Sequence, residues 1–340
     1  MTANPTMTAQ VIRAFGDPGA FETSEIERPE VRPNHALVRV EATSVNPVDS
    51  KLRSGAIPDA TPEFPAVLHG DVAGVVKAVG AGVESVEPGD EVYACGGGVA
   101  GTGGALAEYM LVDAAALARK PDSLSMREAA ALPLVTITAW DGLVDRASVT
   151  PGDAVLVHGG TGGVGHVAVQ VAANLGGVVH ATASTPEKRE TARDLGADYA
   201  IDYTSESVDD YVEAYTDGRG FDVVFDTVGT RGDNLERSLA AAAREGQVLT
   251  TVARGSFEST PMHGKGLSLD AVFMLLPLLH GDRAGLAHHG EILARTATLV
   301  DEGKLTPLLD ETRFGFDDVA AAHRRAESGD HVGKVTVARD

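Results

Sequence analysis

Three glycines in the middle of the chain, Gly160, Gly162 and Gly165, have the spacing G-x-G-x-x-G. They follow an apolar run over 154–158 and open a helical pattern over 164–175, which is the context that this motif requires. In such a turn, backbone N–H groups approach a pyrophosphate at the N-terminus of a helix, where the helix dipole favours negative charge. The spacing therefore predicts a dinucleotide-binding turn. The alternative is a glycine-rich turn with only a structural role.

The residues after the next predicted strand, over 178–182, indicate which dinucleotide binds. In NAD sites an acidic residue usually ends this strand and accepts hydrogen bonds from the ribose hydroxyl groups. This chain has no acid there. It has Ser184 and, in the following helical stretch, Lys188 and Arg189. A hydroxyl group and cations suit a 2′-phosphate, which a carboxylate would repel, so we expect NADPH rather than NADH. The alternative is that both cations are ordinary solvated helix residues.

The elements that must position these residues alternate between strands and helices from Met126 onward. The pattern predicts strands and helices at these places: strands at 154–158, 178–182, 199–201, 222–226 and 247–252, and helices at 164–175, 187–195, 206–215 and 233–243. Such alternation predicts a parallel sheet with helices on both faces. The earlier residues are rich in strand patterns instead. A closing strand, Lys334 to Ala338, follows two helical stretches and is expected to pair with that β-rich part.

Length and charge limit the classes of function. The 340 residues suffice for two domains, and 49 acidic against 28 basic residues give a net charge of −21. A dispersed negative surface disfavours binding to nucleic acid and to anionic membranes. It also fits a halophilic protein that stays soluble in concentrated salt, where self-repulsion is screened. The alternative is an acidic cytoplasmic enzyme.

Cysteine use and hydropathy indicate the compartment. The single cysteine, Cys95, excludes an internal disulfide and argues against a cysteine-rich zinc site. The longest apolar run, Ala271 to Leu279, is shorter than the roughly 18 residues of a membrane helix. The N-terminus lacks the basic-then-apolar order of a signal peptide. We therefore expect a cytoplasmic protein.

Several motifs in a fixed order make the chain resemble the medium-chain dehydrogenase/reductase superfamily, and within it the zinc-free quinone oxidoreductase branch, also called zeta-crystallin-like. The resemblance covers nearly the full length. It rests, beside the glycine turn, on the following segments: 45–49 with 53–55, 70–76, 88–92, 107–109, 132–140, 195–197, 226–229 and 331–334.

The resemblance implies an α/β fold with two domains. Residues 1–128 and 272–340 would form a GroES-like β-rich catalytic domain, and residues 129–271 a Rossmann domain with a doubly wound parallel sheet that binds NADPH. It further implies a homodimer that is joined through edge strands of the Rossmann sheets.

The chain departs from the zinc-dependent members of this superfamily, which hold a catalytic zinc through cysteine, histidine and a second cysteine. The matching positions here are Asn46, Gly70 and a residue near Leu134. A neutral amide and a glycine cannot replace a thiolate and an imidazole around zinc. His69 is one position away from the histidine site, and a one-residue step in a strand points a side chain to the other face. Of the structural-zinc cysteines only Cys95 remains, so we expect no metal.

The resemblance also implies roles for three residues in catalysis. Asn46 replaces the zinc-binding cysteine and is expected to present its amide to the substrate. The alternative is an Asn-Pro turn that caps its own backbone. Lys51 occupies a position that carries a substrate-facing tyrosine in related quinone reductases and a lysine in similar plant enone reductases, so it is expected to stabilise charge on a substrate oxygen. The alternative is a solvated surface lysine. Asp49 is expected to orient its neighbours.

The cofactor contacts implied by the resemblance add to the three glycines of the turn. They are Thr138 near the nicotinamide ribose or phosphate, Gly163 and Val164 at the pyrophosphate, Ser184, Lys188 and Tyr203 at the 2′-phosphate, Val228 near the adenosine, Val252 and Ala253 near the carboxamide, and Gly333 and Lys334 from the returning strand.

The missing metal favours one kind of hydride acceptor. Nothing lowers the pKa of a simple alcohol, whereas addition of hydride to the β-carbon of an enone, or to a quinone, needs only donors at the distant oxygen. We therefore expect an NADPH-dependent, zinc-independent reductase of quinones or α,β-unsaturated carbonyl compounds. The alternatives are a zinc-free alcohol or carbonyl dehydrogenase, a CoA-thioester reductase, and a non-catalytic NADPH-binding sensor or structural protein. Variable loops over Gly96–Gly104 and Thr260–Leu269 are expected to select the substrate.

Overall fold

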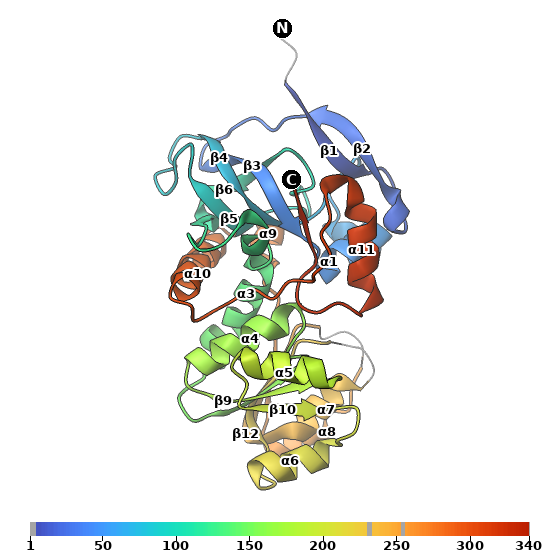
Figure 1. Cartoon of the computed structure of the whole chain (residues 1–340), viewed down its shortest axis with the longest axis vertical. Coiled ribbons are helices and arrows are strands. Elements are labelled where there is room, and N and C mark those ends of the chain that lie inside the picture. The colour runs from blue at the N-terminus through green and yellow to red at the C-terminus, as the bar shows by residue number, and fades with distance from the viewer. Residues whose placement is uncertain (1–4, 230–232, 253–255, 340) are drawn as a thin grey trace. The chain divides into compact units, whose positions relative to one another are not determined.

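The structure is a computed structural model that describes residues 5–229, 233–252 and 256–339, and they form two compact units (Figure 1). The first, here called the β-rich unit, extends to Leu134 and also includes Leu275–Gly303 and the chain from Leu309 onward. The second, the parallel-sheet unit, comprises Val135–Met274 and Lys304–Leu308. The short segment 304–308 belongs to the second unit because its backbone carbonyl groups accept hydrogen bonds from side chains of Gln170 and Asn174.

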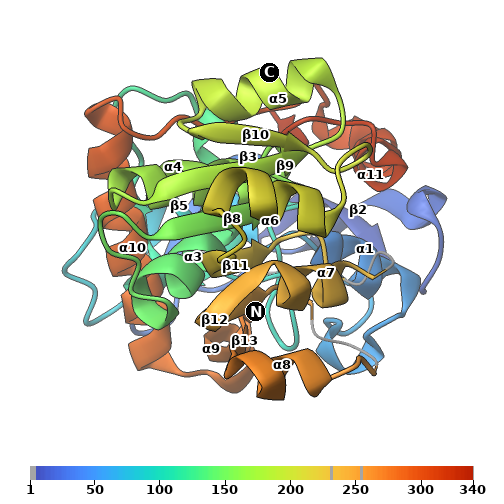
Figure 2. The ribbon, with the colours of Figure 1, turned by 90° about the horizontal axis from the view of Figure 1, so that it is seen from below.

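Six strands of the parallel-sheet unit form one sheet, and every neighbouring pair is parallel. They are β8 (Ala154–His158), β9 (Val178–Ala183), β10 (Tyr199–Asp202), β11 (Phe221–Asp226), β12 (Ala242–Thr250) and β13 (Ser268–Ala271). They lie side by side in the order β10-β9-β8-β11-β12-β13 (Figure 2). This order is that of the doubly wound dinucleotide-binding fold. The predicted α/β class and the first five of these strands are confirmed.

Helices cover this sheet because its strands are apolar on both faces. They are α3 (Pro133–Trp140), which begins in the β-rich unit, α4 (Gly163–Asn174), α5 (Pro186–Asp194), α6 (Val208–Thr216), α7 (Asn234–Ala241) and α8 (Thr260–Lys265). Helix α4 packs against β8 and β9, and α5 against β9 and β10. Tyr211 of α6 and Leu239 of α7 share a core with Leu156 of the sheet.

The segment Thr260–Leu269 is not the irregular loop that the sequence suggested, and its role in substrate selection stays a prediction. It contains α8 and the first residues of β13, which pairs with β12 through Leu269 and Val248. The pattern was hidden because β13 has four residues, too few to show an alternation.

The β-rich unit is built on antiparallel strands. Its main sheet has the order β14-β3-β4-β5-β7, with β6 also paired to β3, and β1 and β2 form a separate pair. The bounds of these strands are β1 Thr6–Ile12, β2 Phe21–Glu27, β3 His35–Ser44, β4 Asp71–Val79, β5 Glu91–Cys95, β6 Tyr109–Asp113, β7 Ala118–Arg119 and β14 Thr336–Ala338. The predicted return of the closing strand is confirmed, since β14 pairs with the end of β3, but it begins at Thr336 rather than at Lys334.

Five helices accompany these strands: α1 (Pro47–Ser54), α2 (Met126–Ala129), α9 (Leu276–His280), α10 (Arg283–Asp301) and α11 (Val319–Ser328). Helix α1 directly follows β3 and, as shown below, carries two of the predicted catalytic residues. Within the described ranges, no helix combines the length and the apolar character needed to cross a bilayer.

Candidate active site

Asn46 and Asp49 lie at the start of α1. Asn46 is the N-cap residue and Pro47 the first helical residue, a combination that favours helix initiation because proline needs no hydrogen-bond partner there. Oδ2 of Asp49 accepts a hydrogen bond from the backbone N–H of Asn46 at 2.7 Å. The side chain of Asn46 is directed to Asp71 and Lys334, and the residue is 1 % exposed.

Asp71, which is not among the predicted site residues, accepts hydrogen bonds from several residues of this group. Its Oδ2 accepts hydrogen bonds from Ser44 Oγ and from Asn46 Nδ2, both at 2.7 Å. Its Oδ1 accepts one from the backbone N–H of Leu134 at 2.8 Å. A fully buried carboxylate is tolerated only with such a set of donors. One feature of the sequence could have indicated this role: Asp71 is an acid at the first position of a mostly apolar strand, 71–79.

Lys334 belongs to the same group. Its ammonium donates to Asn46 Oδ1 and, at 2.9 Å, to the carbonyl oxygen of Val45, and it lies 3.7 Å from Asp71 Oδ2. Burial lowers the pKa of Lys334, and the charge of Asp71 counteracts this. The residue was predicted to contact the cofactor, but the structure places its ammonium in the β-rich unit among these oxygens. Gly333, its neighbour, is buried and has a left-handed backbone with φ of 70°.

Burial raises the pKa of Asp49 to about 7, and the negative charge of Asp71 adds to this effect. The hydrogen bond from Asn46 N–H and the charge of Lys334 act in the opposite direction. Since one ammonium faces two carboxyl groups, a protonated Asp49 leaves Asp71 and Lys334 as a balanced pair. Asp49 is held next to Asn46 by the hydrogen bond from the Asn46 backbone N–H.

Lys51 lies on the same helix, one turn after Pro47, and is half-buried. The structure brings Asn46, Asp49 and Lys334 together, and Lys51 lies on the helix that Asn46 caps and that carries Asp49.

The donor groups present here do not fit zinc. Among the described residues there is no group of three histidine, cysteine or acidic side chains that could hold a metal ion. Gly70 precedes β4, and a Cβ atom there would lie 3.1 Å from Cys95 Sγ. His69 lies before the strand, with φ of 72°, so the argument from strand alternation does not apply to it. Its two ring nitrogens are instead engaged with Thr43 and His323.

The glycine turn between β8 and α4 is a separate candidate site, within the parallel-sheet unit. Helix α4 begins at Gly163, and its first intrahelical bond runs from His166 N to Gly162 O at 3.1 Å. The N–H groups of Gly163 and Val164 precede that bond and need outside acceptors. A Cβ atom on Gly160 would lie 2.6 Å from Ala181 Cβ, so the turn approaches β9 too closely for a side chain. Such a bare backbone cradle at a helix N-terminus fits a pyrophosphate.

The predicted 2′-phosphate residues gather where β9 and β10 end. Ser184 follows β9, and Thr185 caps α5 by accepting a hydrogen bond from Lys188 N at 3.2 Å. Tyr203 follows β10 and is 44 % exposed. These strands pair in parallel, so their carboxyl ends share one edge of the sheet.

Asp202, an acid that is not among the predicted site residues, also lies at this edge, at the end of β10. Its carboxylate pairs with the Arg189 guanidinium at 2.6 Å and accepts a hydrogen bond from Thr204. The hydroxyl of Thr204 holds the pKa of Asp202 below its usual range. Arg189 therefore neutralises the acid and leaves Lys188 as the predicted cation for a phosphate.

Replacing Lys188 with alanine is expected to weaken NADPH binding about tenfold to hundredfold, since one charge-assisted hydrogen bond is lost. NADH binding should change little. Fluorescence titration with both coenzymes measures this, and Arg193→Ala on the exposed side of α5 is the matched control. An equal loss of affinity for both coenzymes would show that Lys188 does not bind the 2′-phosphate.

The remaining residues that were predicted to contact the cofactor differ in their burial. Val228 is exposed after β11, and Asp226 accepts hydrogen bonds from Val228 N and Gly229 N at 3.0 Å, which holds this turn at the same sheet edge. Val252 is half-buried after β12. Thr138 is buried within α3, and Ala253 lies outside the described residues.

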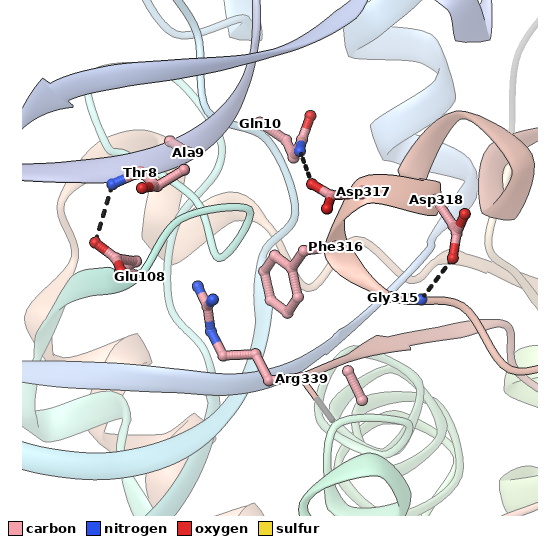
Figure 3. A pocket seen from close by; sticks show the side chains of 10 residues that line it. Thr8, Ala9, Gln10, Glu108, Gly315, Phe316, Asp317, Asp318 and Arg339 are labelled. Carbon is pink, nitrogen blue, oxygen red and sulfur yellow. Dashed lines mark hydrogen bonds between the residues drawn. The ribbon is translucent and has the colours of Figure 1, made fainter.

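The hollow in Figure 3 lies in another part of the β-rich unit and contains none of the predicted site residues. It has a volume of about 580 Å³. Some of its side chains contact each other: Gln10 donates to Asp317 at 3.1 Å, and the Arg339 guanidinium lies 4.4 Å from the centre of the Phe316 ring (Figure 3). We assign no ligand to it.

Comparison with known proteins shows the family of the chain. Residues 32–122 match the family model "Alcohol dehydrogenase GroES-like domain", and residues 195–337 match "Zinc-binding dehydrogenase". The chain is 35 % identical to an NADPH-dependent alkenal/one oxidoreductase of Arabidopsis thaliana chloroplasts, over 95 % of this chain and 78 % of that protein.

Two solved structures are similar over nearly their whole length. An alcohol dehydrogenase superfamily protein from Novosphingobium aromaticivorans is 42 % identical with a TM-score of 0.92, and the match covers 98 % of this chain and all of that one. A quinone oxidoreductase from Pseudomonas syringae is 28 % identical with a TM-score of 0.85, again over 98 % of this chain and all of the other.

Proposed function

The chain belongs to the medium-chain dehydrogenase/reductase superfamily, in its zinc-free quinone oxidoreductase branch, and we propose that it is an NADPH-dependent reductase of quinones or α,β-unsaturated carbonyl compounds. The observation that carries this proposal is the glycine turn at the N-terminus of α4, which is free of side chains and fits a pyrophosphate. The name of the Arabidopsis relative, an alkenal/one oxidoreductase, supports the same acceptor class.

The residues of the parallel-sheet unit fit NADPH. Gly163 and Val164 would donate their N–H groups to the pyrophosphate, with Gly160, Gly162 and Gly165 keeping the cradle free of side chains. Lys188, Ser184 and Tyr203 would hold the 2′-phosphate. When bound, the reduced nicotinamide supplies a hydride to the acceptor.

In the β-rich unit, Asn46 and Lys51 are the proposed donors to the acceptor. Hydride addition to the β-carbon of an enone places negative charge on the carbonyl oxygen, and donors aimed at that oxygen lower the barrier. An amide NH₂ group has two N–H donors, of which Asp71 takes one from Asn46. The second N–H and the Lys51 ammonium would stabilise the oxygen, and Lys51 or water would supply the proton. Asp49 would orient Asn46 through its backbone N–H.

A panel of acceptors tests this function. Oxidation of NADPH, followed as loss of absorbance at 340 nm, is expected with a quinone and an enal, and not with a saturated aldehyde. Turnover of the saturated aldehyde alone would favour a carbonyl dehydrogenase. Binding of NADPH without turnover of any acceptor would favour a sensor or structural protein.

Zinc independence is part of the proposal, although the description of one matching family names zinc. Dialysis against a chelator is expected to leave the reductase activity unchanged, because Asn46, Gly70 and a residue near Leu134 replace the ligands that zinc would need. Elemental analysis of the purified protein checks the same point. Loss of activity on chelation, with recovery on adding zinc, would contradict it.

We propose a homodimer that forms through β13. This strand is at one end of the six-stranded sheet, so its outer edge has no neighbour among the described strands. An unpaired edge strand is a template for pairing with another chain, and two copies can pair symmetrically there. Phe273, which is 43 % exposed just after the strand, would add an apolar contact. Light scattering during gel filtration would give twice the chain mass; a monomer would contradict this.

We also propose that the enzyme is cytoplasmic and that its acidic surface is an adaptation to salt. One cysteine in 340 residues is the usage of a reducing compartment. With a net charge of −21, the folded chain is destabilised by self-repulsion that salt screens. The melting temperature is therefore expected to rise by several degrees between low and multimolar KCl. Equal stability in both would contradict the adaptation.

A further inference from the structure

The ammonium of Lys334 is buried in the β-rich unit, with a side chain that is 3 % exposed, and the proposed chemistry does not use it directly. We infer that Lys334, together with Asp71, is a positioning residue that fixes the orientation of the Asn46 carboxamide. This inference rests on the proposed role of Asn46 in the reduction.

The two neighbours of the Asn46 side chain determine which way its amide faces. An ammonium group only donates hydrogen bonds, so Lys334 Nζ must face Oδ1. An ionised carboxylate only accepts, so Asp71 Oδ2 must face Nδ2, at 2.7 Å. A flipped amide would place N–H groups against the ammonium and oxygen against the carboxylate. Both contacts would then be repulsive, so only one orientation is stable.

Asp71 cannot move to follow a reoriented amide, because other donors hold it. Ser44 Oγ and the backbone N–H of Leu134 bind its two carboxylate oxygens, and Thr43 Oγ1 donates to its backbone carbonyl group at 2.6 Å. The backbone of Asn46 is fixed as well, through the hydrogen bond from its N–H to Asp49. The remaining freedom of Asn46 is rotation of the side chain, and Lys334 removes it.

The position of the ammonium argues against a role in charge balance alone. Lys334 Nζ lies 3.7 Å from the Asp71 carboxylate, whereas its hydrogen bonds go to two neutral oxygens, Asn46 Oδ1 and Val45 O. A buried ion pair is also weak evidence for stability, since apolar residues of similar size often stabilise a core equally well. These contacts therefore support a role of Lys334 in orienting the Asn46 carboxamide more than a role in stabilising the fold.

The loss of Lys334 is expected to change kcat and to leave the binding of NADPH unchanged. If Lys334 fixes the direction of the second Asn46 N–H, its loss lowers kcat, which depends on that donor in the transition state. Binding of NADPH, whose proposed contacts lie mainly in the parallel-sheet unit, should not change.

The test uses Lys334→Met and the isosteric Asp71→Asn, each alone and combined with Asn46→Ala. Each single variant is expected to lower kcat about tenfold to hundredfold, as misplacement of a catalytic group does, with NADPH affinity within about twofold of wild type. In the Asn46→Ala background neither substitution should have a further effect on kcat, because residues that act through one group are not additive. Lys120→Met is the control, since Lys120 is also a buried lysine of this unit and donates to the carbonyl groups of Pro121 and Leu124.

A second readout does not depend on turnover. The chain has five asparagines, so labelling with [¹⁵N]asparagine gives a simple spectrum in which the Asn46 amide is identified by its loss in Asn46→Ala. In wild type its two protons should exchange slowly with solvent, and in Lys334→Met or Asp71→Asn at least about tenfold faster. If Lys334→Met does not fold, Asp71→Asn, which adds no volume, carries the test alone.

The outcomes separate this inference from the proposed function. Unchanged amide exchange in the folded variants, or losses of kcat that are equally large in the Asn46→Ala background, would overturn the positioning role. If wild type turns over no acceptor, the proposed function fails, and the amide exchange alone then supports or overturns the orientation of Asn46 by Lys334.

Discussion

Replacing Gly165 with alanine is expected to abolish measurable NADPH binding, with a loss of affinity of about a hundredfold or more. Gly165 is the third residue of α4, and a Cβ atom there would lie 2.0 Å from the carbonyl oxygen of Gly159 and 3.1 Å from Gly160 Cα. These are backbone atoms, which cannot rotate away as a flexible side chain can. The turn must therefore move off the helix N-terminus, and its N–H groups then no longer converge on one pyrophosphate.

The matched control is Gly264→Ala. Gly264 lies within α8 of the same unit, and a Cβ atom there has no neighbour within 4 Å. Alanine in a helix is favourable by up to about 1 kcal/mol over glycine, so this variant should be as stable as wild type and bind NADPH equally. Titration of both variants with NADPH measures their affinities, and a thermal melt shows whether they are folded. Wild-type affinity in folded Gly165→Ala would mean that NADPH does not use this turn.

The second large effect is a loss of stability in mild acid, caused by a chain of buried hydrogen bonds. Nε of Arg53 donates to His323 Nδ1 at 3.4 Å. His323 therefore carries its proton on Nε2 and donates to His69 Nε2 at 2.9 Å. His69 in turn donates from Nδ1 to Thr43 Oγ1 at 3.2 Å, and the hydroxyl of Thr43 donates to the carbonyl oxygen of Asp71. Each imidazole must be neutral, because one nitrogen of each accepts a hydrogen bond.

The direction of the pH effect follows from these pKa values. Burial lowers the pKa of His323 to about 4 and that of His69 well below the usual 6.5. The unfolded chain binds these protons below pH 6.5 while the folded chain does not, so stability falls as the pH drops from 6.5 toward 4. At pH 5 His323 then costs about 2 kcal/mol of stability, and His69 adds to this loss. Asp49, whose pKa is raised to about 7, acts in the opposite direction between pH 7 and 4 and offsets part of this loss.

His323→Gln tests the contribution of His323 to this loss of stability. The drop in melting temperature between pH 7 and pH 5 is expected to be several degrees smaller in this variant than in wild type, since one proton fewer is taken up on unfolding. His288→Gln, at a residue that is about half exposed on α10, should keep the wild-type drop. If all three proteins lose the same number of degrees, the two imidazoles are not held neutral.

The fold of the parallel-sheet unit could be predicted because its signals are local. Strands β8, β9 and β11 are short apolar runs, and the glycines of the turn are adjacent in sequence. Helix α1 was not predicted, because eight residues that begin with proline show no periodicity, and its capping by Asn46 and Asp49 is visible only in the structure.

The contacts of Lys334 could not be derived from the sequence for a different reason. Lys334 and Asn46 are 288 positions apart, and the pairing of β14 with β3 brings them together. The resemblance suggested that Lys334 contacts the cofactor, but it did not show that the side chain is buried beside Asp71. A lysine that ends up within a core has the same sequence signature as an exposed one.

Transfer of deuterium from NADPH labelled at nicotinamide C4 tests the proposed reduction most directly. With an α,β-unsaturated aldehyde as acceptor, we expect one deuterium at the β-carbon of a saturated aldehyde product and one solvent proton at its α-carbon, read by NMR and mass spectrometry. Deuterium at the carbonyl carbon of an allylic alcohol product, or no transfer at all, would contradict the account.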